Sequence, residues 1–204
     1  MTQCDRVAQL VLSNKGLWRE RDGFWTLGAA TYQDDPRVYP MLADSYRGRQ
    51  LAVFGGWLRD VYAALPYSNI CTPQGFALPG FHIFDHRADR LQGHPHIDEP
   101  YERVAVPEPF TEAFSFTIAV ELPDGVGGLD YWPEHTDAAV EAYMITGELP
   151  EPKYLGYKLG VLVLHDGLTT HRIANPVGIR PGQFRITLQG HGLVLESGKT
   201  VVYF

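Results

Sequence analysis

The feature that most constrains the fold is a close succession of short apolar runs after residue 70. These runs alternate with glycine, proline and aspartate turns, a pattern typical of short strands. The predicted strands cover 74–86, 94–98, 102–106, 113–122, 128–132, 159–164, 171–174, 184–189, 192–195 and 200–203. So many short strands favour a mainly β architecture that is either closed or built from two sheets.

The first 70 residues have a different character. Apolar residues recur at helical spacing in several segments, and an aromatic-rich run indicates one strand. We predict helices over 5–13, 36–46 and 49–65, and a strand over 24–32. A chain of 204 residues fits one domain. We therefore expect residues 1–70 to form a mostly helical support and residues 71–204 to form the β core of the same domain.

Residues 133–158 interrupt the run of strands. Ala138, Ala139, Val140 and Ala142 predict a helix there, and prolines follow it at 150 and 152. A segment of this length between strands is more typical of an insertion than of a plain loop. We expect a helical insertion near 133–158 that covers the core as a lid.

Composition narrows the class of protein and of partner. The net charge of −7 disfavours nonspecific nucleic-acid binding, which needs a basic surface. Cys4 and Cys71 are far apart and form no C-x-x-C motif, so neither a thiolate zinc site nor a disulfide framework is indicated. No apolar run is long enough to span a bilayer, and no leader pattern is present. We expect a cytoplasmic protein that acts on a small molecule, with no nucleic-acid or membrane partner; its oligomeric state stays open.

The chemistry centres on the stretch 93–98, of sequence Gly-His-Pro-His-Ile-Asp. In an extended strand, side chains two residues apart point to the same face, so His96 and Asp98 would face one point. A further histidine would complete the 2-His-1-carboxylate set that binds Fe(II) and leaves coordination positions open. His171 and His165 compete for that role, and His171 is favoured because it opens a predicted strand whereas His165 precedes a turn.

Further along the chain, Arg185 and Thr187 share one face of the strand predicted over 184–189. His191, flanked by Gly190 and Gly192, is interpreted as a residue of the turn that follows this strand. The ordered set His96-x-Asp98, His171 and Arg185-x-Thr187 resembles the Fe(II)/2-oxoglutarate-dependent dioxygenases. The family pattern is His-x-Asp, a distal histidine, and an arginine followed two residues later by serine or threonine. The resemblance covers roughly residues 75 to 195 and implies a double-stranded β-helix, a relative of the jelly roll and cupin barrels.

The resemblance also implies roles for these residues. His96, Asp98 and His171 would bind Fe(II), while Arg185 with Thr187 would bind the distal carboxylate of 2-oxoglutarate. A guanidinium suits that task because it offers a fixed pair of donors to a carboxylate. The implied activity uses O2 and releases succinate and CO2 while hydroxylating a small molecule such as an amino acid or natural-product intermediate. In the halogenating branch of the family a small residue replaces the carboxylate, so Asp98 favours hydroxylation.

Two alternatives remain from the sequence alone. His94, His96, Glu99 and Glu102 partly resemble a cupin metal site, whose enzymes act without 2-oxoglutarate, although the cupin glycine spacing is missing and Arg185 is left unexplained. The chain could also be a non-catalytic jelly-roll binding module with structural histidines.

The segment before the motif leaves further roles open. His82, Phe84 and His86 share one face of their predicted strand, where they could line the pocket; otherwise His82 and His86 are partly buried polar residues of the strand. Arg87 either meets a substrate carboxylate or lies on the surface.

Overall fold

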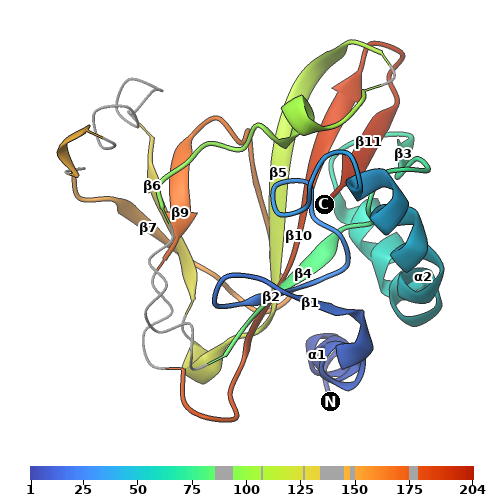
Figure 1. Ribbon diagram of the computed structural model, residues 1–204. Coiled ribbons are helices and arrows are strands. Elements are labelled where there is room, and N and C mark those ends of the chain that lie inside the picture. Colours follow the sequence, from blue (N-terminus) through green and yellow to red (C-terminus); the bar gives the residue numbers. More distant parts are fainter. Residues whose placement is uncertain (86–93, 107, 126, 134–144, 148–149, 175–178) are drawn as a thin grey trace.

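The computed structural model describes residues 1–85, 94–106, 108–125, 127–133, 145–147, 150–174 and 179–204 (Figure 1). This part of the chain is mainly β, as the sequence predicted. The helices are α1 (Gln3–Ser13), α2 (Tyr39–Ala64) and the short 3-10 helices η1 (Lys15–Leu17), η3 (Pro100–Arg103) and η4 (Pro123–Gly125). The strands are β1 (Trp18–Glu20), β2 (Trp25–Leu27), β3 (Ile70–Cys71), β4 (Gly80–Phe84), β5 (Phe110–Glu121), β6 (Gly128–Trp132), β7 (Lys153–Gly156), β8 (Leu162–His165), β9 (Thr170–Ile173), β10 (Arg185–Leu195) and β11 (Thr200–Tyr203).

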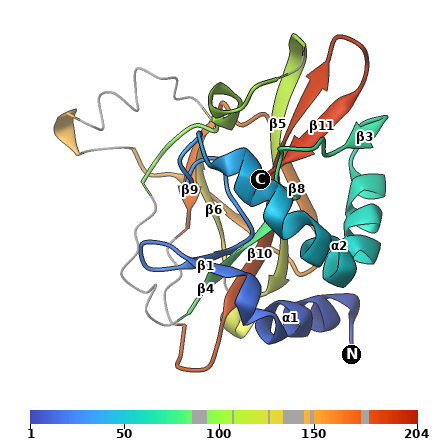
Figure 2. The ribbon, with the colours of Figure 1, turned by 45° about the vertical axis from the view of Figure 1, so that its right-hand side comes forward.

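The strands form one large and one small sheet. The eight-stranded sheet has the order β1-β2-β4-β10-β11-β3, and β5 pairs with both β10 and β8. The three-stranded sheet has the order β7-β6-β9. Within the described residues neither sheet closes on itself. Figures 1 and 2 show α1 and α2 on one side of the large sheet and the small sheet on the other.

The large sheet has one apolar face and one polar face. Because side chains alternate along a strand, Phe81 and Ile186 turn toward the helices, where they join Phe54 of α2 and Val11 of α1 in one buried cluster. Each large side chain buried in this way contributes roughly 1.5–3 kcal/mol. The alternate positions on β4, β5, β8 and β10 are rich in polar residues and face the small sheet. They include His82, Ser115, Thr117, His165, Gln189 and His191.

Strand β10 is continuous, whereas we expected a turn at residues 190–192 between two strands. Both glycines of that stretch lie in the strand, opposite β5. A Cβ atom at Gly190 would lie 2.5 Å from the Phe116 ring, and one at Gly192 would lie 2.0 Å from the Phe114 ring. These glycines therefore make room for aromatic rings from the neighbouring strand, and the turn prediction is wrong.

The helical prediction also needs correction. Residues 36–46 and 49–65 were expected to be two helices, but a single helix, α2, runs from Tyr39 to Ala64. A Cβ atom at Gly48 would meet nothing within 4 Å, so no packing contact interrupts the helix there. Each glycine in the helix lowers helix stability by about 1 kcal/mol relative to alanine, and packing of α2 against the sheet offsets this loss.

Other predicted segments also differ, and the strands predicted over 24–32 and 74–86 are shorter, as β2 and β4. Residues 94–98 form no strand, although His96 makes an isolated bridge with His171. The strand expected over 102–106 is replaced at its start by η3. In the expected helical insertion, Lys153–Gly156 is strand β7, because it pairs with β6. The residues that predict the helix, within 138–144, lie outside the described residues.

A membrane span was not expected, and no described helix is both long and apolar enough to cross a bilayer.

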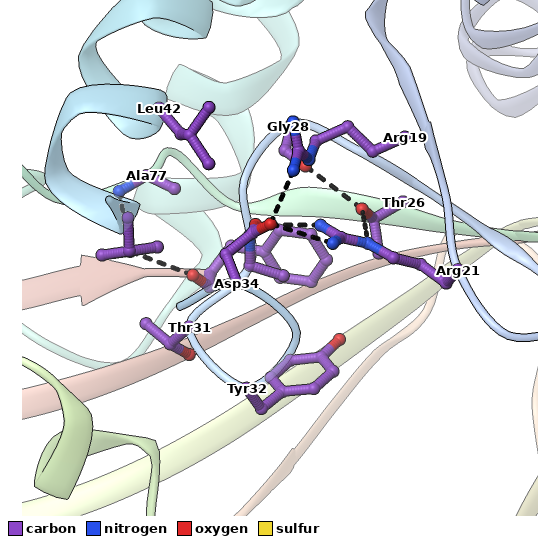
Figure 3. Close-up of polar contacts among 12 residues, drawn as sticks. Arg19, Arg21, Thr26, Gly28, Thr31, Tyr32, Asp34, Leu42 and Ala77 are labelled. Atoms are coloured by element: carbon purple, nitrogen blue, oxygen red, sulfur yellow. Dashed lines mark hydrogen bonds and ion pairs between the residues drawn. The ribbon is translucent and has the colours of Figure 1, made fainter. Parts of the chain in front are cut away.

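The loop after β2 is held by a buried carboxylate (Figure 3). Both oxygens of Asp34 accept hydrogen bonds from Arg21, at 2.9 Å each, and Arg19 donates to the same carboxylate at 2.8 Å. The backbone N–H of Ala30 donates a fourth bond at 2.8 Å. The Asp34 side chain is only 3% exposed, so these donors replace water around its charge. The network fixes the loop that carries Tyr32.

Asp34→Ala should lower the free energy of unfolding by about 3 kcal/mol, because it leaves buried arginine charge without a partner. Denaturant unfolding at pH 7 measures this. Asp35→Ala is the matched control: its ion pair with Arg37 is exposed and should be worth less than about 1 kcal/mol. Equal losses in the two variants would show that the buried network does not stabilise the fold.

The difference between wild type and Asp34→Ala should also depend on pH. Burial alone would raise the pKa of Asp34, but the hydrogen bonds and charge of Arg21, with the Ala30 N–H and Arg19, lower it below its ordinary value of 3.8. A lowered folded-state pKa gives stability that is complete above the ordinary pKa and is lost as the pH falls through the folded value. The stability difference should therefore be constant from about pH 5 to 7 and shrink in stronger acid.

Candidate metal centre

His96 and His171 are held together by their backbones. The N–H of His96 donates to the carbonyl of His171, and the N–H of His171 donates back to His96, both at 2.9 Å. The two imidazole centroids lie 4.6 Å apart. Residues 75 positions apart in the chain are thus fixed opposite each other before any ligand is considered.

Both imidazoles are fixed with the same nitrogen free. His96 Nδ1 lies 2.7 Å from the carbonyl of His94, and His171 Nδ1 lies 2.7 Å from the carbonyl of Thr169. A carbonyl oxygen only accepts, so each Nδ1 must carry the proton. In the neutral rings Nε2 then has a free lone pair. This arrangement is the one that metal-bound histidines show, because the second nitrogen is anchored and the ring orientation is set.

Asp98 completes the group. Its backbone N–H donates to the carbonyl of Gly167 at 2.7 Å, which anchors it to the turn before β9. One carboxylate oxygen is 3.7 Å from His96 Nε2 and the other is 3.4 Å from His171 Nε2. The three ligand atoms all lie within 4.8 Å of one another. Among the described residues this group of two imidazoles and one carboxylate could hold a metal ion.

The electrostatics of the group suit a cation. Burial would raise the pKa of Asp98, but the His171 hydrogen bond and the nearby charges of His191, His171 and His96 hold that pKa well below its usual range. Burial lowers the pKa of His96, assisted by His171. Burial opposes protonation of His171 as well, but the hydrogen bond and charge of Asp98 raise its pKa overall. The group therefore combines an ionised carboxylate with two imidazoles fixed in one geometry.

The group opens into a cavity of about 650 Å³ between the large and small sheets. This volume is in the range of sites for small ligands. Its lining combines the three candidate ligands with the polar face of the large sheet and an aromatic wall of Phe24, Tyr32 and Phe84. Asp22, Gln33, Glu99 and Arg103 also line it.

Arg185 and Thr187 lie on the polar face of β10, and both are fully buried. The guanidinium carbon of Arg185 lies 5.5 Å from the ring centroids of both Phe84 and Tyr157, and one nitrogen donates to the carbonyl of Gly128 at 3.2 Å. Its Nε and Nη1, and the hydroxyl of Thr187, have no hydrogen-bond partner among the described residues. Burial lowers the pKa of Arg185. A buried cation without an acid partner is costly, so this position is suited to an anionic ligand.

Several cavity residues were not anticipated from the sequence. Tyr32 lies far from the motif in the chain, but its hydroxyl makes a short hydrogen bond to His82 Nε2. His191, interpreted as a turn residue, lies in β10 with Nδ1 2.9 Å from Ser115 Oγ and 3.9 Å from Asp98. The alternation of β10 would have found His191 if the flanking glycines had not indicated a turn.

The structure places the residues around the His96-x-Asp98 motif in different surroundings. His82 and Phe84 line the cavity, which is one of the two alternatives that the sequence left open for them. Burial lowers the pKa of His82 to about 3, so its ring is neutral at pH 7. His86 and Arg87 lie outside the described residues. The side chain of His94 is exposed and is not part of the candidate ligand group.

No protein-family model and no curated protein sequence matches the chain. Solved structures do match the fold of this chain. An N-substituted L-amino acid dioxygenase from Burkholderia ambifaria AMMD, in complex with α-ketoglutarate (2-oxoglutarate), is 13% identical with a TM-score of 0.62; the match covers 100% of this chain and 83% of that one. A second structure of an N-substituted L-amino acid dioxygenase from the same organism is 15% identical with a TM-score of 0.50, covering 100% and 92%. At this identity the likeness concerns the fold: the chain folds like these dioxygenases.

Proposed function

We propose that this protein is an Fe(II)- and 2-oxoglutarate-dependent oxygenase built on a double-stranded β-helix, and that it hydroxylates a small molecule. The observation that carries the proposal is the group of His96, Asp98 and His171, with both Nδ1 atoms anchored by backbone carbonyls and both Nε2 atoms within 3.7 Å of the Asp98 carboxylate. Two imidazoles and one carboxylate are the ligand set of non-haem Fe(II) oxygenases.

The residues present fit both implied groups. Hard carboxylate and borderline imidazole donors suit Fe(II), and no thiolate enters the group. Arg185 and Thr187 fit the distal carboxylate of 2-oxoglutarate, because their buried donors lack partners among the described residues. Phe84 and Tyr157 flank the guanidinium and would keep water from competing for it.

The chain's residues would divide the work of the reaction. Bound Fe(II) would supply the activation of O2, so that 2-oxoglutarate, O2 and a substrate C–H bond give succinate, CO2 and a hydroxylated product. His96 and His171 would hold the metal with rings anchored by carbonyls, while Asp98 would supply the compensating negative charge. Retention of Asp98 supports hydroxylation over halogenation.

The cavity supports a small organic substrate. Its aromatic wall, Phe24, Tyr32 and Phe84, offers apolar contact, and Phe24 stacks on Phe84 with ring centroids 5.1 Å apart. Arg103, an exposed residue that lines the same cavity, donates to the carbonyl of Thr31 at 3.1 Å. An amino acid or natural-product intermediate with an acidic group and an apolar body fits these surroundings.

The direct test is turnover. The purified protein, supplied with Fe(II), ascorbate, O2 and 2-oxoglutarate, should form succinate, and candidate amino acids should stimulate the rate. Anaerobic addition of 2-oxoglutarate to the Fe(II)-loaded protein should give a weak visible charge-transfer band. The proposal fails if the metal-loaded protein neither shows the band nor forms succinate.

His96→Ala should weaken Mn²⁺ binding at least a hundredfold, because it removes one of three ligands; loss of a supporting outer residue alone costs about 10- to 100-fold. Calorimetric titration with Mn²⁺ measures this without redox chemistry. His94→Ala is the matched control: it keeps the carbonyl that anchors His96 and should bind Mn²⁺ within about twofold of wild type. A large loss in His94→Ala would instead favour a cupin-like ligand set.

Arg185→Met should have opposite effects on ligand binding and on stability. It removes the charged donors for the distal carboxylate, and 2-oxoglutarate affinity should fall about a hundredfold or more. It also replaces an unpaired buried cation by a side chain of similar length, so the ligand-free protein should be as stable as wild type or more stable. Unfolding midpoints and 2-oxoglutarate titrations measure the two effects. A strongly destabilised variant would show that Arg185 has a structural role instead.

A further inference from the structure

His165 lies in a row of polar residues that crosses the polar face of the large sheet. It ends β8, where it is opposite Ser115 of β5, and Ser115 is in turn opposite His191 of β10. The His165 ring centroid is 4.7 Å from that of His171. His165 also lines the cavity, so this imidazole lies beside the candidate metal ligands and reaches the space that a ligand would occupy.

The position of the proton on His165 follows from its surroundings. The backbone N–H of Gly167 donates to His165 Nδ1 at 3.1 Å. That nitrogen must therefore keep its lone pair, and the neutral ring carries its hydrogen on Nε2. No described residue accepts a hydrogen bond from this Nε2–H. The ring thus presents an N–H donor at Nε2, whereas His96 and His171 are anchored through Nδ1 and have Nε2 beside the Asp98 carboxylate.

A strip of the polar face of the large sheet leads from His165 toward Arg185, which is fully buried. The next row along the two strands is Thr117 opposite Val163, both on the same face as Ser115 and His165. Val163 packs against the buried cluster of Ala119, Leu129 and Tyr157, and the Tyr157 ring lies 5.5 Å from the guanidinium of Arg185. His165 therefore marks the metal end of the strip and Arg185 marks the far end. A dicarboxylate that reaches from the metal to Arg185 would lie along it.

We infer that His165 is a cosubstrate-binding residue whose Nε2–H donates a hydrogen bond to the 2-oxo acid end of 2-oxoglutarate, beside the metal. This inference rests on the proposed function and deepens it. It assigns the two ends of the cosubstrate to different parts of the wall: the 2-oxo acid end to His165 and the distal carboxylate to Arg185. His165, which is not part of the candidate ligand group, would then bind the cosubstrate.

The test compares two ligands on Mn²⁺-loaded protein, by calorimetry and without turnover. 2-Oxoglutarate carries both ends, whereas pyruvate carries only the 2-oxo acid end. His165→Phe keeps a ring but removes the donor, and affinity for both ligands should fall by about tenfold, the effect of one hydrogen bond to a charged group. His165→Gln returns an N–H donor and should recover most of the affinity. Arg185→Met should weaken 2-oxoglutarate only.

Each other result has a defined meaning. Unchanged affinity of His165→Phe for both acids overturns the inference, as does a loss confined to 2-oxoglutarate, which would place the contact at the distal end. Loss of Mn²⁺ binding itself would make His165 a metal ligand and also overturn it. If the wild-type protein binds Mn²⁺ but neither acid, the proposed function fails first. His165→Leu replaces the Phe variant if the phenyl ring unfolds the protein.

Discussion

The arrangement of the site depends on the pair of backbone hydrogen bonds between His96 and His171. These bonds bring a segment that has no strand of its own against β9, and the register of the bridge decides which side chains meet. A slip of one residue in this bridge would turn the imidazole of His96 away from that of His171. The carbonyls two residues before each histidine then orient the rings. The main chain therefore builds the candidate centre, and the side chains need only be of the right type.

The bridge belongs to the small sheet, and the large sheet supplies the wall of the cavity on the other side. The apolar face of the large sheet is covered by α1 and α2, which leaves the other face free to carry polar residues. The same alternation of β10 that buries Ile186 against the helices turns Arg185 and Thr187 inward. One face of β10 therefore contributes to the hydrophobic core, and the other face carries the polar residues beside the site. On the same side as the site, the Asp34 network holds the loop that places Tyr32 against His82.

The sequence predicted the mainly β character and several strands well; β6 and β11 have the predicted bounds. It also named His96, Asp98 and His171, which lie together in the structure, although the strand alternation expected for His96-x-Asp98 is absent because residues 94–98 form no strand. Alternation along β10 does place Arg185 and Thr187 on one face. The continuity of β10 could not be predicted, since Gly190 and Gly192 look like turn residues until the rings of Phe116 and Phe114 are known. The placement of Tyr32 and the anchoring of Asp98 by Gly167 depend on contacts between distant segments, which no local pattern records.

The unpaired polar atoms on the polar face of the large sheet link the stability of the folded protein to ligand binding. Arg185, Thr187 and His82 each leave a buried polar atom without a partner among the described residues, and each such atom costs about 1–3 kcal/mol, more for a charged group. A fold can retain this cost only if other contacts exceed it, and here the helix-covered face supplies them. A ligand that pairs with these donors removes the cost in the bound state alone, so binding should also stabilise the folded protein. Under the proposed function, an anion would pair with the arginine charge, whereas a neutral ligand would leave that charge unpaired.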